Sequence, residues 1–154
     1  MKILCLDIET APNTVHVWGL FSQDISLNQI LESSYVLCWA AKWVGQPEVM
    51  FERTHKTNRS SLGMIRRIHA LMSAADCILT YNGTKFDLPT LNREFVTAGL
   101  AQPAPTRHLD LLKVAKAQFR FVSNKLDYVA QHLGVGKKTE QDRKSTRLNS
   151  SHVS

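Results

Sequence analysis

The sequence predicts an α/β domain with a mixed β-sheet, and three observations lead to that prediction. Short apolar runs rich in Val, Ile, Cys and aromatic residues fill the first third of the chain. The apolar period then changes from that of strands to that of helices, and the two kinds of segment alternate. The 154 residues suffice for one domain with its own core. Together these features are typical of a sheet layered against helices.

Four segments in the first part of the chain are predicted to be strands. Residues 2–8 are apolar at odd and even positions alike, which favours a central strand covered on both faces. Residues 14–20 and 35–44 are rich in Val, Trp and Tyr and predict two further strands. A turn at Gly45-Gln46-Pro47 then leads to a short strand over residues 48–52.

Helices enter the pattern after residue 60. Apolar residues recur at helical spacing over residues 62–75, with Ser60 or Ser61 as the N-cap. Residues 77–81 form another strand of the buried type. Asp87, with a proline two positions later, suits the start of a helix that Gly99 ends.

Two shorter helices are predicted towards the end of this region. A loop with Pro103 and Pro105 leads to Asp110, which we interpret as the cap of a helix over residues 111–118. Ser123 or Asn124 caps a last helix through residue 133, which Gly134 ends.

Composition narrows the class of protein. The hydrophobic content of 44% is ordinary for a globular protein, and no apolar stretch approaches the length needed to span a membrane. We therefore expect a soluble, intracellular protein with no membrane partner. The net charge of +6 is compatible with a polyanionic partner such as nucleic acid. The cysteines Cys5, Cys38 and Cys77 lie in strand-like runs without metal-type spacing, so we expect reduced, buried thiols.

Three acids are candidates for chemistry. Asp7 and Glu9 are two positions apart on a predicted strand, so they share a face with about 6.5–7 Å between their Cα atoms. Asp87 follows another predicted strand and could face that pair if the two strands are neighbours. Converging acids without a cation partner are costly unless a divalent ion binds them. Solvated acids at a strand end, and a capping role for Asp87, are the alternative interpretations.

The ion type follows from the ligand type. Carboxylates select hard ions such as Mg²⁺ or Mn²⁺, and two such ions about 3.5–4 Å apart are the usual arrangement for phosphodiester hydrolysis. The predicted cofactor is therefore a pair of Mg²⁺ or Mn²⁺ ions.

Two segments carry a family resemblance when they are taken together. They are Leu6-Asp7-Ile8-Glu9-Thr10 and Tyr81-Asn82-Gly83-x-x-Phe86-Asp87-x-Pro89-x-Leu91. The pair resembles the first two exonuclease motifs of the DEDD superfamily, the proofreading-type 3′–5′ exonucleases with a ribonuclease H-like fold. The resemblance extends over about residues 1–140, Phe119-Arg120-Phe121 included, and is strongest to DnaQ-like members of the phage and DNA-polymerase-B types.

The resemblance implies roles for particular residues. Asp7, Glu9 and Asp87 would be the catalytic metal ligands. Thr10 would lie near the terminal nucleotide, and Asn82 and Phe86 would shape the pocket for the strand end. The aromatic rings Phe86, Phe119 and Phe121 could stack on bases, with core packing as the alternative for each.

The implied substrate is the 3′ end of single-stranded DNA. RNA is the alternative substrate, and a non-catalytic nucleic-acid-binding module is the alternative function. The resemblance also implies replication or repair machinery as a partner and the cytoplasm of a bacterial or phage-infected cell as the location.

The end of the sequence departs from the family. The third motif, a Tyr or His followed within a few residues by a fourth Asp, has no match, since no acid follows His132 at the needed distance. Residues 142–152 fit a translated sequencing adapter. We therefore expect a partial exonuclease domain over residues 1–141 and a non-native tail over residues 142–154.

Because the third motif is missing, we predict that the 154-residue chain releases little or no nucleotide from single-stranded DNA in Mg²⁺. Release of labelled mononucleotide by the purified chain measures this. Robust Mg²⁺-dependent release that Asp7→Ala abolishes would contradict the prediction.

Overall fold

The computed structural model describes residues 1–54, 61–104 and 106–138. The chain divides into two compact units. The first comprises Met1–His16 and Ser26–Leu111, and the second comprises Val17–Ile25 and the residues after Leu111. The predicted tail of residues 142–154, its boundary at residue 141, and the residues Ser60 and Pro105 lie outside the described residues.

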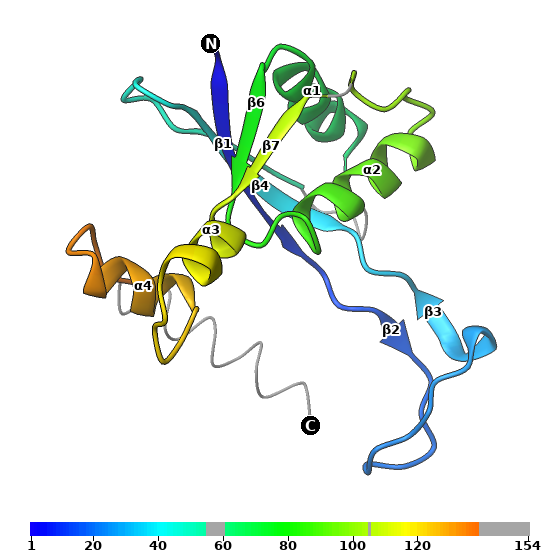
Figure 1. Cartoon of the computed structure of the whole chain (residues 1–154). Helices are drawn as coiled ribbons and strands as arrows, with labels where there is room; N and C mark the ends of the chain where they lie inside the picture. The colour runs from blue at the N-terminus through cyan, green and yellow to red at the C-terminus, as the bar shows by residue number, and fades with distance from the viewer. Residues whose placement is uncertain (55–60, 105, 139–154) are drawn as a thin grey trace. The chain divides into compact units, whose positions relative to one another are not determined.

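A five-stranded mixed sheet is the framework of the first unit (Figure 1). Its strands are β1 (Ile3–Thr10), β4 (Val36–Trp43), β5 (Met50–Arg53), β6 (Cys77–Thr80) and β7 (Arg107–Asp110), in the order β5-β4-β1-β6-β7. The pairs β1–β6 and β6–β7 are parallel, whereas β1–β4 and β4–β5 are antiparallel. The predicted α/β class and mixed sheet are confirmed. The strand β7 was not predicted, because we expected a loop that leads to Asp110 over these residues.

The central strand β1 has one buried and one exposed face. Leu4, Leu6 and Ile8 are buried, while Cys5 and Asp7 are exposed. The predicted central position is confirmed, but the expectation that both faces are covered is wrong for the described residues. β1 is central because strands pair with both of its edges, and this pairing does not require a layer on each face.

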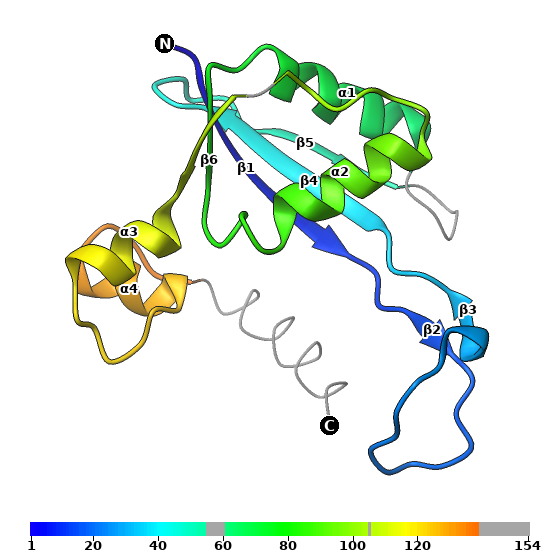
Figure 2. The ribbon, with the colours of Figure 1, turned by 45° about the vertical axis from the view of Figure 1, so that its right-hand side comes forward.

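Two helices cover the buried face of the sheet (Figure 2). They are α1 (Leu62–Ser73) and α2 (Asp87–Thr97). Their buried residues join those of β1, β4 and β6 in one core, whose largest members are Trp39 and Phe95. Ser61 is the N-cap of α1, because its hydroxyl accepts a hydrogen bond from the Met64 N–H at 3.2 Å. Gly99, at φ +70°, follows the end of α2 as predicted.

The predicted strand over residues 14–20 is mostly absent. Only β2 (Thr14–Val15) forms, and it pairs with β3 (Ile30–Glu32), which the short 3₁₀ helix η1 (Leu27–Gln29) precedes. Backbone pairing between these segments ends where the His16 N–H donates to the Gln29 carbonyl, so the apolar residues after His16 have no strand to pair with among the described residues. Of these, Trp18, Leu20 and Phe21 are 82%, 98% and 92% exposed.

The second unit contains α3 from its second residue (Leu111–Gln118) and all of α4 (Leu126–His132). Lys125 is the N-cap of α4 in place of the predicted Ser123 or Asn124, and the Ser123 hydroxyl accepts a hydrogen bond from the Lys125 N–H. Four rings gather there: Phe119 stacks on Phe121 at 5.1 Å between centroids, and Phe121 also lies against Tyr128 and His132. No helix of the described ranges is long and apolar enough to cross a membrane.

The three thiols differ in accessibility. Cys77 is buried as predicted, whereas Cys5 is exposed and Cys38 is intermediate, because both lie on the face of the sheet opposite α1 and α2. Partial burial, followed by the negative charge of Asp7, raises the pKa of the Cys5 thiol above 9.0.

We predict that, among single-cysteine variants, the one that keeps Cys5 reacts with maleimide in the native state and the one that keeps Cys77 reacts only after denaturation. Because the pKa of Cys5 is raised, its reaction should be slower than that of free cysteine and should accelerate steadily from pH 7 to pH 9. Mass spectrometry against time gives the rates. Native labelling of Cys77 as fast as that of Cys5 would refute the assignment of faces.

Candidate active site

The candidate site lies at one edge of the sheet, where parallel strands end. β1 pairs with β6 from Ile3 opposite Cys77 to Cys5 opposite Leu79, and β6 ends at Thr80. β1 continues to Thr10, so Asp7 and Glu9 extend past the end of its neighbour. The carboxyl ends of parallel strands are where α/β sheets usually bind ligands.

Asp7 and Glu9 lie on the same face of β1, as predicted. Both are exposed, and Ile8 between them is 3% exposed and faces the core. Glu9 is opposite Cys38 on β4. The charges of Glu9 and Asp7 add to partial burial in raising the pKa of the Cys38 thiol.

Asp87 reaches β1 from the first turn of α2. Its side chain is buried, with 3% of the residue exposed, and its Oδ1 accepts a hydrogen bond from the Ile8 N–H at 3.1 Å. Ile8 lies beyond the last paired residue between β1 and β6, so its amide finds an acceptor in a side chain. The N-cap of α2 is Phe86, and a capping role for Asp87 is therefore wrong.

The charges of Asp7 and Asp87 interact. Burial raises the pKa of Asp87 from 3.8 to about 6, and the charge of Asp7 adds to the rise. The Ile8 N–H opposes the shift by stabilising the carboxylate, and the more remote Asp110 adds a smaller rise. The structure thus brings together two of the three predicted acids, with Glu9 two residues along the same strand face.

The predicted substrate residues surround this edge. Thr10 is the last residue of β1, next to a β-bulge where the register with β4 shifts. Asn82 lies in the turn of residues 81–86 between β6 and α2, with φ at +68°. Phe86 is 43% exposed immediately before Asp87.

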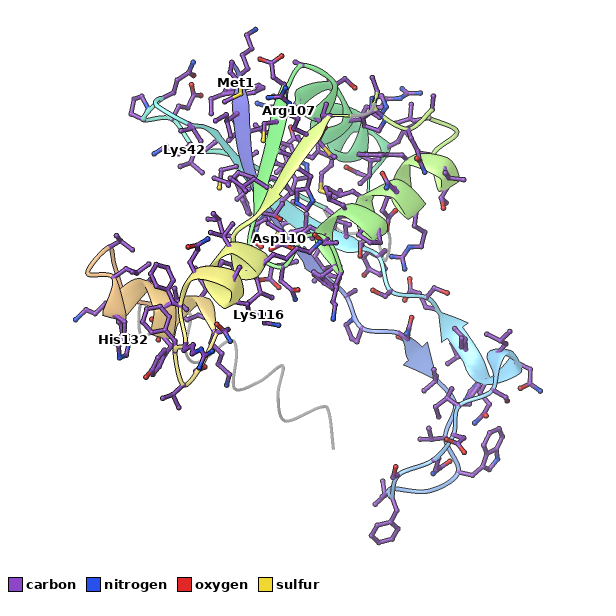
Figure 3. The ribbon with its side chains drawn as sticks, viewed as in Figure 1. Met1, Lys42, Arg107, Asp110, Lys116 and His132 are labelled. Carbon is purple, nitrogen blue, oxygen red and sulfur yellow. The ribbon has the colours of Figure 1, made fainter. Side chains whose placement is uncertain are left out.

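Sequence reasoning missed the residues that hold the 81–86 turn. Asp110 directly precedes α3, the position of the predicted helix cap, and it is also the last residue of β7 (Figure 3). It is 5% exposed and accepts hydrogen bonds from the Asn82 and Thr84 backbone N–H groups. Thr80 binds the Gly83 N–H and also His108 on β7. The alternation of polar and apolar residues in His108-Leu109-Asp110 was the available sign of a strand. Three residues directly before a helix are too few to distinguish a strand from a helix cap.

The donor atoms fit a hard divalent ion in type. Asp7, Glu9 and Asp87 offer carboxylate oxygens, and Asp7 and Asp87 repel each other where a cation would be favourable. No group of three or more His, Cys, Asp or Glu side chains within the described ranges stands ready to hold a metal ion. Glu9 is exposed on the same face of β1 as Asp7.

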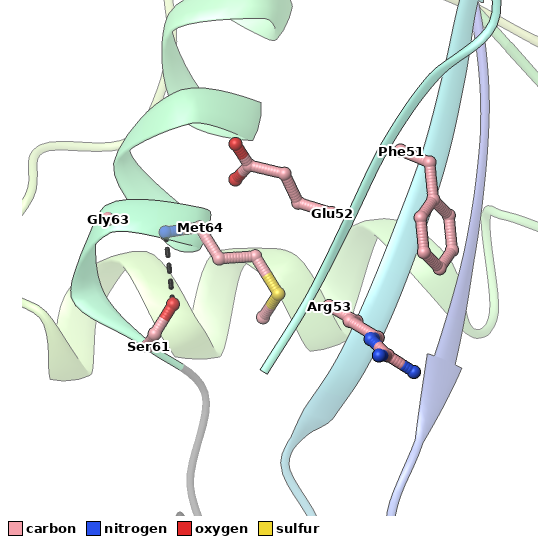
Figure 4. A pocket seen from close by; sticks show the side chains of 6 residues that line it. All are labelled: Phe51, Glu52, Arg53, Ser61, Gly63 and Met64. Atoms are coloured by element: carbon pink, nitrogen blue, oxygen red, sulfur yellow. Dashed lines mark hydrogen bonds between the residues drawn. The ribbon is translucent and has the colours of Figure 1, made fainter. Parts of the chain in front are cut away.

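Two hollows of the first unit lie away from these acids. One of about 520 Å³ is between β5 and α1 (Figure 4). Its polar groups serve the fold, since Glu52 pairs with Arg67 at 2.6 Å and Ser61 caps α1. The lining of another, of about 550 Å³, includes Arg93 and Glu94, which bind the backbone of residues 34 and 36. Neither hollow is lined by Asp7, Glu9 or Asp87, so the candidate site coincides with neither.

A family model described as the RNase_H superfamily matches residues 4–147. The chain belongs to the RNase_H superfamily. Its members are generally hydrolytic nucleases that use divalent metal ions, and the predicted ribonuclease H-like fold is confirmed. No curated protein matches the chain.

The structure is also similar to that of a family B DNA polymerase from the hyperthermophilic archaeon Pyrobaculum calidifontis, with a TM-score of 0.62 and 19% sequence identity. The match covers 88% of this chain and 18% of the polymerase chain. At this identity the likeness establishes the fold alone.

We predict that Asp87→Asn stabilises the metal-free chain at neutral pH. A raised folded-state pKa means that the stability from Asp87 is fully present below about pH 4 and is lost as the pH rises through about 6. The amide keeps the acceptor for Ile8 without the buried charge. Urea unfolding in EDTA should show a gain of about 1–3 kcal/mol at pH 7.5 that shrinks towards pH 4. Asp76→Asn, which alters an exposed carboxylate that accepts the Lys2 N–H, is the control. A gain that does not change with pH would contradict this account.

Proposed function

We propose that this domain is a two-metal 3′–5′ exonuclease that hydrolyses phosphodiester bonds at single-stranded 3′ ends, with DNA as the preferred substrate. The observation that carries the proposal is the convergence of Asp7 and Asp87 where β1 passes the end of β6. Membership of the RNase_H superfamily supports hydrolytic nuclease chemistry, and the first two motifs support the exonuclease subtype.

In this proposal Asp7, Glu9 and Asp87 hold a pair of Mg²⁺ or Mn²⁺ ions. When bound, such a pair supplies a hydroxide nucleophile and stabilises the charge on the leaving oxygen. Asp87 contributes a carboxylate that is fixed at two points, by the start of α2 and by the Ile8 N–H. Asp7 and Glu9 contribute exposed carboxylates on the face of β1 that phosphate can reach.

Three neighbouring residues would bind the end of the strand. Thr10 offers its backbone to the 3′-hydroxyl from the end of β1. Phe86 exposes part of its ring beside Asp87, and stacking on a base contributes about 1–3 kcal/mol without sequence preference. Asn82 completes the pocket from the turn.

The preference for DNA and the biological setting are the finer parts of the proposal. The similarity to a DNA polymerase at the level of fold favours DNA over RNA and suggests a role beside replication or repair machinery. A net charge of +6 suits a polyanionic substrate. The cytoplasm of a bacterial or phage-infected cell is the location that this function implies.

Metal binding is the primary test, because the 154 residues contain no match to the third motif. We predict saturable Mn²⁺ binding by calorimetry, with an affinity that falls at least about tenfold in Asp7→Asn, Glu9→Gln and Asp87→Asn, which is about 1.4 kcal/mol or more. Asp76→Asn, distant from the site at the start of β6, should bind as the wild type does. Absence of saturable Mn²⁺ binding would overturn the exonuclease proposal and favour a non-catalytic nucleic-acid-binding module.

Polarity is tested with excess chain and excess Mn²⁺ on matched DNA and RNA strands. Any residual cleavage should release labelled mononucleotide at once from a 3′-labelled strand and should shorten a 5′-labelled strand stepwise. Faster cleavage of RNA would identify an exoribonuclease, and internal cuts would exclude an exonuclease.

A further inference from the structure

Three consecutive backbone amides in the 81–86 turn donate to side chains of the two adjacent parallel strands. The Asn82 N–H donates to Asp110 Oδ1 at 2.8 Å, and the Thr84 N–H donates to Asp110 Oδ2 at 3.2 Å. Between them the Gly83 N–H donates to Thr80 Oγ1 at 3.1 Å. Thr80 and Asp110 are direct partners in the register of β6 and β7. The carboxylate therefore spans the turn with both oxygens.

This conformation needs external support. Asn82 has φ at +68°, which costs a non-glycine residue free energy. At Gly83 an added Cβ would lie 2.2 Å from Thr80 Oγ1, so the backbone runs directly over that side chain. Hydrogen bonds to a charged acceptor are stronger than those to a neutral one, so the two that Asp110 accepts favour this conformation of the turn.

Hydrogen bonds from the residues on either side of Asp87 link its position to the turn. The Phe86 N–H donates to the Asn82 carbonyl at 3.3 Å, and the Leu88 N–H donates to the Gly83 carbonyl at 2.9 Å. Asp87 lies between these two donors, so its position depends on Asn82, which Asp110 binds, and on Gly83, which Thr80 binds. Its carboxylate then meets the Ile8 N–H at 3.1 Å. A continuous chain of hydrogen bonds thus leads from β7 through the turn to β1.

We propose that Asp110 is the positioning residue of the site: its carboxylate fixes the backbone of Asn82 and Thr84 and thereby places Asp87 against β1. This role rests on the proposed function, since it concerns the placement of a proposed metal ligand. Asp110 acts through the backbone that its two oxygens bind. His108 supports the same turn through its 2.8 Å contact with Thr80 Oγ1.

The test compares Asp110→Asn and Asp110→Ala with the wild type in two assays. The amide variant keeps one carbonyl acceptor but presents an NH₂ group to one of the two N–H donors, and the alanine variant removes both acceptors. In metal-free protein, hydrogen exchange at the Asn82 and Thr84 amides should accelerate at least about tenfold in the alanine variant and less in the amide variant. The affinity for Mn²⁺ should fall about 10–100-fold yet remain saturable, as expected when a residue that supports a ligand is changed.

Two control variants separate positioning from general destabilisation. Ile68→Val removes one methylene from the buried face of α1 and lowers global stability away from the turn. In this variant the hydrogen-exchange rates of the turn amides relative to those of α1 should be unchanged. Its affinity for Mn²⁺ should equal that of the wild type. Asp76→Asn changes another carboxylate that accepts a backbone N–H, at the opposite end of β6, and should resemble the wild type in both assays.

Each contrary result has a separate meaning. Unchanged exchange at Asn82 and Thr84 in Asp110→Ala would overturn the positioning role. Complete loss of saturable Mn²⁺ binding in Asp110→Asn would also overturn it by making Asp110 a direct ligand. A wild-type chain that binds no Mn²⁺ would overturn the proposed function, and the exchange rates alone would then decide whether Asp110 holds the turn.

Discussion

The hydrogen bond from the Ile8 N–H to Asp87 Oδ1 is the contact on which the candidate site depends. It exists because β6 stops at Thr80 while β1 runs on to Thr10. The Ile8 N–H, which has no partner on β6, therefore donates to the Asp87 carboxylate at the start of α2. One bond therefore fixes the start of a helix to the central strand and brings the Asp87 carboxylate to the strand that carries Asp7 and Glu9.

At Asp87 the requirements of stability and of the proposed function conflict. A carboxylate that is 3% exposed beside a second carboxylate is unfavourable when ionised, and the pKa of about 6 expresses that cost. A divalent ion would remove the repulsion, which is why the same geometry that destabilises the metal-free protein would favour metal binding. The exposed face of β1, with Asp7 and Glu9 next to Cys5 and Cys38, leaves the acids open to a ligand.

The residues of the turn between β6 and α2 are constrained because the turn fixes where α2 begins. Asn82 adopts a positive φ, and Gly83 has no Cβ that would clash with Thr80. The Asp110 carboxylate accepts hydrogen bonds from the Asn82 and Thr84 N–H groups. None of these side chains needs to touch a substrate to matter. Their shared effect is to define where α2 begins, and with it the position of Asp87.

The sequence by itself determined the alternation of strands and helices and the shared face of Asp7 and Glu9, because these follow from periodicity along the chain. The two motifs also pointed to the correct fold. Tertiary structure decided the rest. Val17–Leu20 have strand-like composition but no strand partner among the described residues, and Cys5 lies on the face of the sheet opposite α1 and α2. Asp110 ends a strand and binds a turn that is remote in the chain. Strand pairing and the burial of a polar side chain depend on neighbours remote in the chain, and local pattern carries no information about them.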